Sequence, residues 1–366
     1  MARISDLVGA VTALCGTACA QFGSNVPIDT RSLDEIYAAA LKETGTLNVA
    51  SGGDAGWQGD GTVAAFEGRF PGLKLNLTVD LSKYHDSRID RAYLAGNEYI
   101  DVAILQTLHD FPRWRDQQRL LNYKPANFED IYLGEKDLNG AFLPNSFNSF
   151  GNFVYDSTKV AAADVPKNYM EILDPKWKGK LVLTYPNDDD AVAYLFSIIV
   201  EKYGFGWLDA LAQQDVQWVR GSETPSIKIL ENHSNSTGSD RVLTFTSIGY
   251  FKGPADFITS APVEVPETKM SWCQTMAIFK STKVPETAKL FMSYMSSPEI
   301  QGASGGLSTL MSLDSGNVYS SNITQISWFR NFMHDRATVD WWKLQFETTL
   351  GSAQGPGPLE LFPKGS

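Results

Sequence analysis

Short apolar segments alternate with segments of helical spacing along residues 46–105, and this alternation limits the possible folds more than any other feature of the chain. The predicted strands are residues 46–50, 73–81 and 101–105, and the predicted helices are residues 62–70, 86–96 and 111–123. Such an order is typical of an α/β layer whose sheet is largely parallel. The first part of the chain is therefore predicted to form one such layer.

A second α/β unit is predicted at residues 150–268. Its strand-like segments are residues 152–156, 180–185, 215–221 and 241–247, and a long amphipathic helix begins near Asp188. A strand at residues 270–280 then leads to a helix that starts with Pro285, a residue favoured in a first turn. Aromatic-rich helices are predicted at residues 324–336 and 338–350, followed by a flexible Gly/Pro-rich tail at residues 351–366.

The charge of the chain argues against nucleic acid and anionic membranes as main partners. The 366 residues carry a net charge of -11 with a pI near 4.9, whereas binding to polyanions needs clustered Lys or Arg. The densest basic run, at residues 176–180 (KWKGK), is too short to reverse this.

The first twenty residues have the pattern of a secretory signal peptide. Arg3 gives a positive start, a short apolar stretch follows, and Ala18-Cys19-Ala20 is an A-x-A-like cleavage site before Gln21. A buried N-terminal helix is the alternative interpretation. Since no later segment reaches about 18 uninterrupted apolar residues, we expect the mature protein to be soluble and secreted, or periplasmic in a bacterium.

Cleavage after Ala20 would leave Cys273 as the only cysteine, which excludes an internal disulfide and a zinc site built from cysteines. Four N-x-S/T sequons are glycosylation candidates, although chance gives roughly two or three in a chain of this composition. They lie at Asn76, Asn232, Asn235 and Asn322.

Five segments resemble the type II extracellular solute-binding proteins, in particular the ferric-iron, thiamine and phosphonate-type binding components of ABC importers. They are LNVASGG (47–53), AAFEGRFPGLKL (64–75), IDVAIL (100–105), LDPKWKGKLVLTYP (173–186) and VPETAKLFMSYMSSPEIQ (284–301). They occur in order between about residue 46 and residue 301, and DPKWKGK and SSPEIQ are the most specific phrases.

The resemblance implies two α/β lobes, each a mixed, mostly parallel sheet flanked by helices, joined by two crossover strands. Lobe one would be residues 46–149 with residues 269–350, and lobe two residues 150–268. It also implies a monomer that captures a small molecule or metal ion by hinge closure, with an ABC permease as partner if the organism is bacterial. Used sequons would instead indicate a eukaryotic secretory route, in which such a permease is missing.

A glycine-rich loop follows the first predicted strand and is the first candidate for ligand contact. Gly52, Gly53, Asp54 and Trp57 lie where an open α/β sheet presents its ligand contacts, and side-chain-free backbone can approach a ligand closely. The glycine spacing matches neither a dinucleotide fingerprint nor a P-loop. A tight turn without ligand contact is the alternative.

Further candidates lie in the other loops that the two-lobe mapping brings to the cleft. They are Gln106, Asp188, Asp189, Ser222, Glu223, Tyr250 and Trp272. Asn187 or Asp188 would be a natural cap for the helix that follows, which is the alternative role for residues 187–190 (NDDD). Three carboxylates at that helix start disfavour an anionic ligand, so an organic cation or a metal ion is favoured.

Transfer of ferric-iron binding from the family is not straightforward. The ferric binders place two adjacent tyrosines on lobe two, whereas this chain has Tyr250 followed by Phe251. The four histidines, His85, His109, His233 and His334, show no ligand spacing. We therefore assign no metal site and no cofactor.

An enzyme is the competing class of function, and we predict none. The chain has no G-x-S-x-G elbow and no H-E-x-x-H motif, and nothing singles out a carboxylate pair for glycoside hydrolysis. A secreted carbohydrate-active enzyme and a secreted interaction protein that has lost transport remain the alternatives to a solute-binding protein.

Overall fold

The computed structural model describes residues 26–234, 240–247, 256–303, 307–315, 318 and 324–365. The predicted signal peptide, Tyr250 and two of the sequon asparagines, Asn235 and Asn322, lie outside these residues. Of the other two, Asn76 is exposed on a strand, and the half-buried Asn232 donates a hydrogen bond to the backbone oxygen of Arg241.

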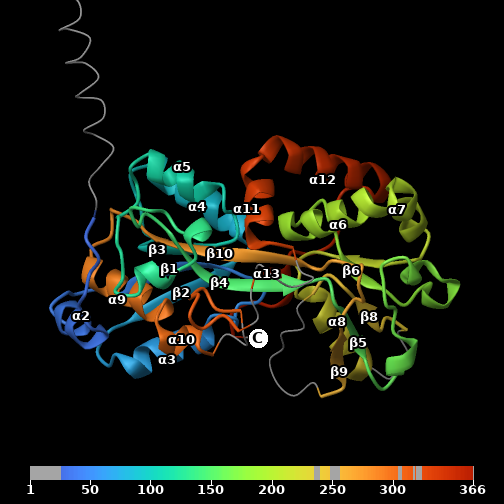
Figure 1. The fold of residues 1–366 in the computed structure, drawn as a ribbon, viewed down its shortest axis with the longest axis horizontal. Coiled ribbons are helices and arrows are strands. Elements are labelled where there is room, and N and C mark those ends of the chain that lie inside the picture. The colour runs from blue at the N-terminus through green and yellow to red at the C-terminus, as the bar shows by residue number, and fades with distance from the viewer. Residues whose placement is uncertain are drawn as a thin grey trace, which may run out of the picture.

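The first lobe is built around a five-stranded sheet in the order β2-β1-β3-β10-β4 (Figure 1). Its strands are β1 (Leu47–Gly52), β2 (Leu75–Asp80), β3 (Val102–Leu105), β4 (Leu143–Phe150) and β10 (Met270–Ile278). β1 pairs in parallel with β2 and β3, while β10 runs antiparallel to β3 and β4. The predicted α/β layer is confirmed, and the carboxyl ends of β1 and β3 lie side by side.

Helices cover both faces of this sheet. They are α2 (Leu33–Ala40), α3 (Asp60–Arg69), α4 (Ser82–Leu94), α5 (Asp110–Asp116), α9 (Pro285–Met295) and α10 (Pro298–Gln301). Phe66, Phe70 and Phe291 fill the core on one face, and Phe111 and Trp114 fill the core on the other. Since β3 is buried on both faces, its four residues are all apolar, as expected for a central strand.

Helix α5 is shorter than the helix predicted at residues 111–123. It ends at Asp116, and Gln118 then adopts a positive φ of 58°. The chain leaves the helix there to form a β-bridge between Leu120 and Phe279. Leu120, which the prediction placed on the helix, is instead buried in this bridge, just beyond the end of β10.

In its described residues, the second lobe has five short strands and three helices of its own. The strands are β5 (Phe153–Asp156), β6 (Val182–Thr184), β7 (Gln217–Val219), β8 (Leu243–Thr244) and β9 (Ile258–Ala261). The helices are α6 (Asp190–Tyr203), α7 (Phe205–Ala212) and α8 (Thr224–Ser234). β8, β5 and β9 form one sheet and β6 pairs with β7, while a bridge between Leu181 and Leu243 links the two sheets.

Single-turn 3₁₀-helices lie in the connections of both lobes. They are Phe128–Asp130, Leu133–Glu135, Ala162–Asp164, Glu171–Leu173 and Pro175–Trp177. The last of these begins in the DPKWKGK phrase, where the side chain of Asp174 accepts a hydrogen bond from the backbone of Lys176. Trp177 is buried in the core of the second lobe, which explains its place in that phrase.

β4 and β10 pair over most of their length and carry the chain between the lobes (Figure 1). The pairing runs from Leu143 opposite Met276 to Phe150 opposite Met270, with an irregularity between Gln274 and Thr275. These strands are the two crossovers that the resemblance implied.

The last two long helices pack on the second lobe, which corrects the expected assignment of residues 269–350 to lobe one. α11 (Ile326–His334) and α12 (Arg336–Leu350) lie against α6, and α12 also contacts α7 (Figure 1). Phe329 and Phe346 belong to the same core as Phe196. The aromatic-rich helices bury their apolar faces there because α6 offers an apolar surface that the second lobe's own strands leave uncovered.

The C-terminal segment is packed against both lobes rather than held loosely as expected. It contains the short helix α13 (Pro358–Leu361). Directly after this helix, Phe362 O accepts a hydrogen bond from Gly56 N of lobe one at 2.9 Å. On the second lobe, Asn187 donates to Gly351 O at 3.1 Å. We call residues 351–365 the C-terminal strap.

Within the described residues, no single helix has the length and apolar character to cross a bilayer. Only α6 and α7 taken together pass such a test, and they meet at a bend of 115°.

Candidate functional site

The main candidate site is a cavity of about 240 Å³ between the lobes, which we call the central cavity. The loops after β1 and β3, the start of α4, a loop of the second lobe and the crossover strands line it. The residues are Ser51, Gly52, Gly53, Asp54, Gln58, Gly59, Thr62, Leu77, Leu81, Ser82, Ile104, Gln106, Asn145, Asn148, Ser222, Glu223, Trp272, Gln274 and Met295.

The glycine-rich loop forms one wall of the central cavity, and its first two glycines are required by close packing. A Cβ on Gly52 would lie 2.2 Å from Ser82 Oγ, and a Cβ on Gly53 would lie 2.7 Å from a methyl group of Val79. Gln58 Oε1 fixes the loop because it accepts hydrogen bonds from the backbone of Asp54 at 2.7 Å and of Ala55 at 3.0 Å. The loop is therefore more than a tight turn: it holds Asp54 at the boundary between the lobes.

Asp54 joins the lobes directly. Its Oδ2 accepts hydrogen bonds from Glu223 N at 2.9 Å and from Ser222 Oγ at 3.1 Å, both of the second lobe. Burial raises the pKa of Asp54 to about 6, and the negative charge of Asp189 adds to this rise. A carboxyl group with such a pKa is one whose ionised form gains from a nearby cation.

The structure brings seven of the predicted ligand residues together in the wall of the central cavity. They are Gly52, Gly53, Asp54, Gln106, Ser222, Glu223 and Trp272. Asp188 and Asp189 line a neighbouring cavity instead, and Trp57 is half-buried in the turn without lining either cavity. Tyr250 lies outside the described residues.

Four amide side chains of the wall were not singled out from the sequence. Gln58, Asn145, Asn148 and Gln274 come from three separate segments, and Gln274 donates to Gly52 O at 3.1 Å. Single amide residues without a motif give no signal in one sequence, so only the crossover topology reveals them. Asn145 Oδ1 and Trp272 Nε1 are buried without a hydrogen-bond partner in the part of the chain that the structure describes.

Asp188 is held by two basic residues, one from each lobe. Lys83 of α4 donates to its Oδ1 at 2.8 Å, and Arg220 of the second lobe donates to its Oδ2 at 3.0 Å. Arg220 also donates to the hydroxyl group of Tyr84 at 2.9 Å, across the boundary. Burial acts to raise the pKa of Asp188, but Lys83 and Arg220 outweigh it and hold that pKa below its usual range.

The other two carboxylates of the NDDD run have structural partners. Asp189 caps α6 by accepting hydrogen bonds from the backbone of Ala191 and Val192, so the cap is Asp189 and not Asn187 or Asp188. Asp190 is paired with Lys343 at 2.7 Å and Arg336 at 2.9 Å of α12. Against the effect of burial, these two lower the pKa of Asp190 to about 2. We call residues 188–190 the acidic triplet.

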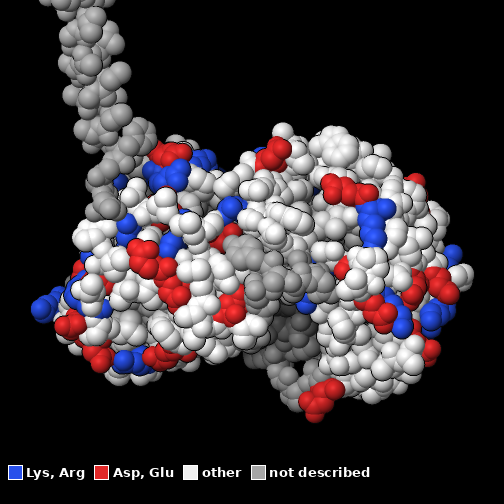
Figure 2. Space-filling view, viewed as in Figure 1, with Lys and Arg blue, Asp and Glu red and all other residues white. Residues whose placement is uncertain are grey.

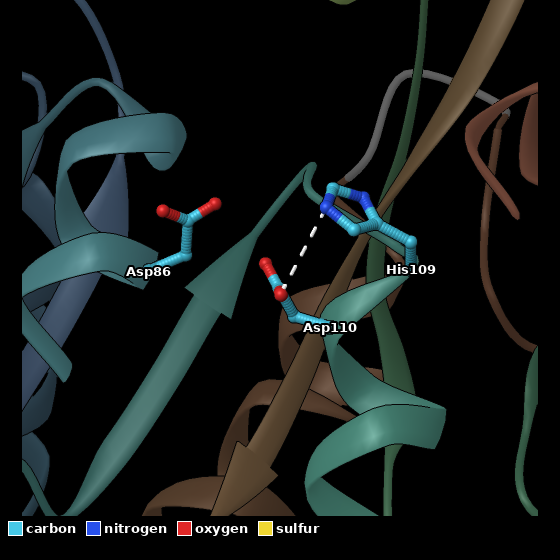
Figure 3. Close-up of side chains that lie close together, drawn as sticks. All are labelled: Asp86, His109 and Asp110. Atoms are coloured by element: carbon cyan, nitrogen blue, oxygen red, sulfur yellow. Dashed lines mark ion pairs between the residues drawn. The ribbon is translucent and has the colours of Figure 1, made fainter. Parts of the chain in front are cut away.

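The acidic triplet borders a second cavity of about 120 Å³, beside the central one. Asp86 of α4 and His109, just before α5, lie in its lobe-one wall, and Asp110 at the start of α5 lies close to both of them (Figure 3). Burial raises the pKa of Asp86 to about 7, and Asp110 opposite adds to the rise. The four histidines show no ligand spacing in the sequence. In the structure, however, His109 lies close to two possible ligands, the adjacent Asp110 and Asp86, which is 23 positions earlier in the sequence.

Acidic and basic side chains are interspersed over the surface of both lobes on the face that Figure 2 shows. Among the described residues of that face, Lys and Arg do not gather into one broad area.

Comparison with protein families matches residues 97–227 to the bacterial extracellular solute-binding proteins. A search of curated proteins finds no match. Among solved structures, the substrate-binding protein of an ABC transporter from Agrobacterium tumefaciens is similar with a TM-score of 0.67 at 14% identity, over 85% of this chain and 96% of that one.

Two further similar structures carry ligands in their descriptions. Iron-bound HitA from Pseudomonas aeruginosa has a TM-score of 0.57 at 14% identity, over 82% of this chain and 99% of that one. The spermidine/putrescine ABC transporter protein PotD from Streptococcus pneumoniae, in complex with calcium and HEPES, has a TM-score of 0.54 at 12% identity, over 84% and 100%. Residues 97–227 thus match the bacterial extracellular solute-binding proteins, and most of the chain has the two-lobed α/β fold of the periplasmic solute-binding proteins.

Proposed function

We propose that this chain is a non-catalytic solute-binding protein that captures a small, positively charged organic molecule in the central cavity by hinge closure. The observation that carries the proposal is the composition of that cavity. Among the described residues that line it, Asp54 and Glu223 are the only charged ones, one from each lobe. A ligand that touches both would favour the closed arrangement, because it gains from each lobe only when the lobes meet.

The size and polarity of the cavity support a small solute with several N–H donors. Its volume of about 240 Å³ is below the roughly 300–1,000 Å³ of pockets for drug-sized ligands. Carboxylate and amide oxygens of the wall accept hydrogen bonds from ammonium groups, and the Trp272 ring offers a face for cation–π contact. The unpartnered Asn145 Oδ1 adds a buried acceptor. An amine-bearing solute therefore matches this wall better than an anion does.

Ferric iron is the second candidate because HitA, which shares the fold, is described as iron-bound. The wall of the central cavity has two carboxylates but no tyrosine, histidine or cysteine among the residues that the structure describes. A hard trivalent cation would therefore have to rely on carboxylates and on groups outside this wall. An organic cation remains our first choice.

The proposed role extends to delivery of the solute outside the cytoplasm. The matched family is extracellular, and the fold is shared with ABC transporter binding proteins. We infer that the protein acts as a monomer, secreted or periplasmic, and hands its ligand to an ABC permease if its host is bacterial. Mass spectrometry of the exported protein should find Gln21 at the new N-terminus and would also report any glycan at Asn76 or Asn232.

Isothermal titration calorimetry with putrescine and spermidine as probes tests the proposed ligand class. We expect saturable binding of one molecule per chain, and at least about tenfold weaker binding in Asp54→Asn and in Glu223→Gln, because each loses a charged hydrogen-bond partner. Glu231→Gln is the matched control, since Glu231 lies exposed on α8 and pairs with Lys228.

The same titrations separate the alternatives. Binding of ferric citrate but not of amines would replace the organic cation by iron. Binding of phosphates or sugars alone would overturn the cation preference. Turnover of an oligosaccharide would place the protein among the carbohydrate-active enzymes, whereas a binding protein only saturates.

A further inference from the structure

Apart from the central cavity, one group of side chains has the composition of a metal site. Asp86, His109 and Asp110 each offer one ligand atom, and these atoms lie within 4.8 Å of one another. Figure 3 shows the three side chains converging from α4 and from the start of α5. All three belong to the first lobe, so their arrangement does not depend on how the lobes are closed.

Asp110 is the buried centre of this group. It is 2% exposed, its Oδ1 lies 3.8 Å from His109 Nε2, and the guanidinium group of Arg113 also binds Oδ1. Its other oxygen, Oδ2, is buried without a hydrogen-bond partner in the ranges that the structure describes. A buried carboxylate oxygen in that state is costly unless a further group binds it.

The basic side chains around the second cavity do not supply that partner. Lys83 is paired with Asp188, while Arg336 and Lys343 are paired with Asp190. Asp86 faces Asp110, and two facing carboxylates repel each other unless a proton or a cation lies between them. Thr107 lines the same cavity, is 3% exposed, and its hydroxyl group has no partner among the described residues.

We propose that Asp86, His109 and Asp110 bind a divalent transition-metal ion, with Zn²⁺ as the best match. Two carboxylate oxygens and one imidazole nitrogen form a donor set that suits Zn²⁺, and three protein ligands leave a fourth position for water or another group. Ligand atoms 2.0–2.2 Å from one ion lie about 3.3 Å apart. The separations between ligand atoms therefore need to shorten by at most roughly 1.5 Å, so each atom moves inward by less than about 1 Å.

The ion would lie in lobe one beside the residues that hold the lobes together. Asp86 is on the same helix as Lys83, three residues further along, and Lys83 forms the inter-lobe ion pair with Asp188. A metal bound there would fix the start of α4 against the start of α5. This role is separate from the proposed solute binding, which uses other side chains.

Titration of the chelator-treated full chain with Zn²⁺, followed by calorimetry, tests the proposal. We expect one Zn²⁺ per chain and at least about tenfold weaker binding in Asp110→Asn, His109→Gln and Asp86→Asn. Asp116→Asn is the matched control because Asp116 is an exposed acid on the same helix that pairs only with Arg115. Since Asp110 is buried, the more exposed Asp86→Asn keeps the test valid if Asp110→Asn fails to fold.

Co²⁺ used in place of Zn²⁺ identifies the ligands independently. Oxygen and nitrogen ligands give d–d absorption without a thiolate charge-transfer band, which separates this site from Cys15, Cys19 and Cys273. Absence of saturable Zn²⁺ binding, a thiolate band, or equal affinity in all three variants and the control would each overturn the proposal.

Discussion

The central cavity and the acidic triplet lie side by side and are both rich in carboxylates, yet their electrostatics are opposite. Asp188 and Asp190 are each paired with two basic side chains, and Asp189 caps a helix. No Lys or Arg is among the described residues that line the central cavity, and burial raises the pKa of Asp54. The number of acidic residues in a segment therefore says little about the charge that a ligand meets, because the partners decide it.

The largest expected effect is on the stability of the fold and comes from Asp190, the member of the acidic triplet that pairs with two basic residues of α12. Asp190→Ala leaves Lys343 and Arg336 without their partner, which for a buried pair costs about 3 kcal/mol of unfolding free energy. Thermal unfolding should show a fall in Tm of several degrees. Asp340→Ala is the control because Asp340 is exposed and lies 4.0 Å from Arg336.

The pH dependence of that contribution has a definite sign. Since the pKa of Asp190 is lowered to about 2, its stabilisation is fully present above its unfolded pKa near 4 and is lost as the pH falls through 2. The difference in Tm between the wild type and Asp190→Ala should therefore be constant from pH 7 to about pH 5 and shrink below about pH 4. A difference that grows on acidification would contradict the ion-pair assignment.

The next effect is on closure of the lobes. Asp188→Asn removes the carboxylate that pairs with both Lys83 and Arg220. Because these side chains are partly exposed, we expect closure of the lobes to lose about 2 kcal/mol rather than the full value for a buried pair. Spermidine affinity should fall about thirtyfold while Tm changes little. An unchanged affinity would show that the closed arrangement does not need this ion pair.

Acidification should weaken cation binding in the central cavity. In the closed arrangement, Asp54 is mostly protonated below a pH of about 6, and a ligand cation must then displace that proton. The affinity for the cation should therefore be about tenfold lower at pH 5 than at pH 7. Without ligand, the raised pKa of Asp54 has the opposite effect on closure of the lobes. The closed arrangement is favoured at low pH, and this advantage is lost as the pH rises through 6. Calorimetry at both pH values measures the effect, and the Asp54→Asn variant should not show it.

The smallest effect concerns the C-terminal strap, which contacts both lobes. A chain that ends at Gly351 loses the Gly56–Phe362 hydrogen bond beside the central cavity and the packing of Pro358 on Gly221. We expect a small increase in the radius of gyration in X-ray scattering and a few-fold change in ligand affinity, since one neutral hydrogen bond contributes about 1 kcal/mol. Identical scattering from the full chain and the shortened chain would mean that the strap does not help to hold the lobes closed.

Local patterns were sufficient to predict the α/β layers and the glycine loop of the cavity wall, whereas the crossover strands were implied by the family resemblance. The strand at residues 46–50 and the glycine loop after it could be located because a parallel strand and a close backbone approach each leave a sequence signature. The resemblance then placed Ser222 and Glu223 opposite that loop, where the structure has them.

Contacts between distant segments could not be predicted in the same way. Asp86 and His109 share no spacing rule, and they meet only because α4 follows β2 and α5 follows β3 on the same edge of the sheet. Asp190 has an ordinary helix-start pattern, and its partners on α12 are more than 140 residues away. The partners that neutralise the acidic triplet were thus invisible to local reasoning.

The position of α11 and α12 has a consequence for how the protein is made. These helices complete the core of the second lobe, although the chain has by then returned to the first lobe and left it again. A ribosome that has synthesised residues 1–325 has made every strand of the three sheets in the described residues, but not the helices that carry Phe329 and Phe346 to the core around α6. The core of the second lobe can therefore be completed only after residues 326–350 have been synthesised.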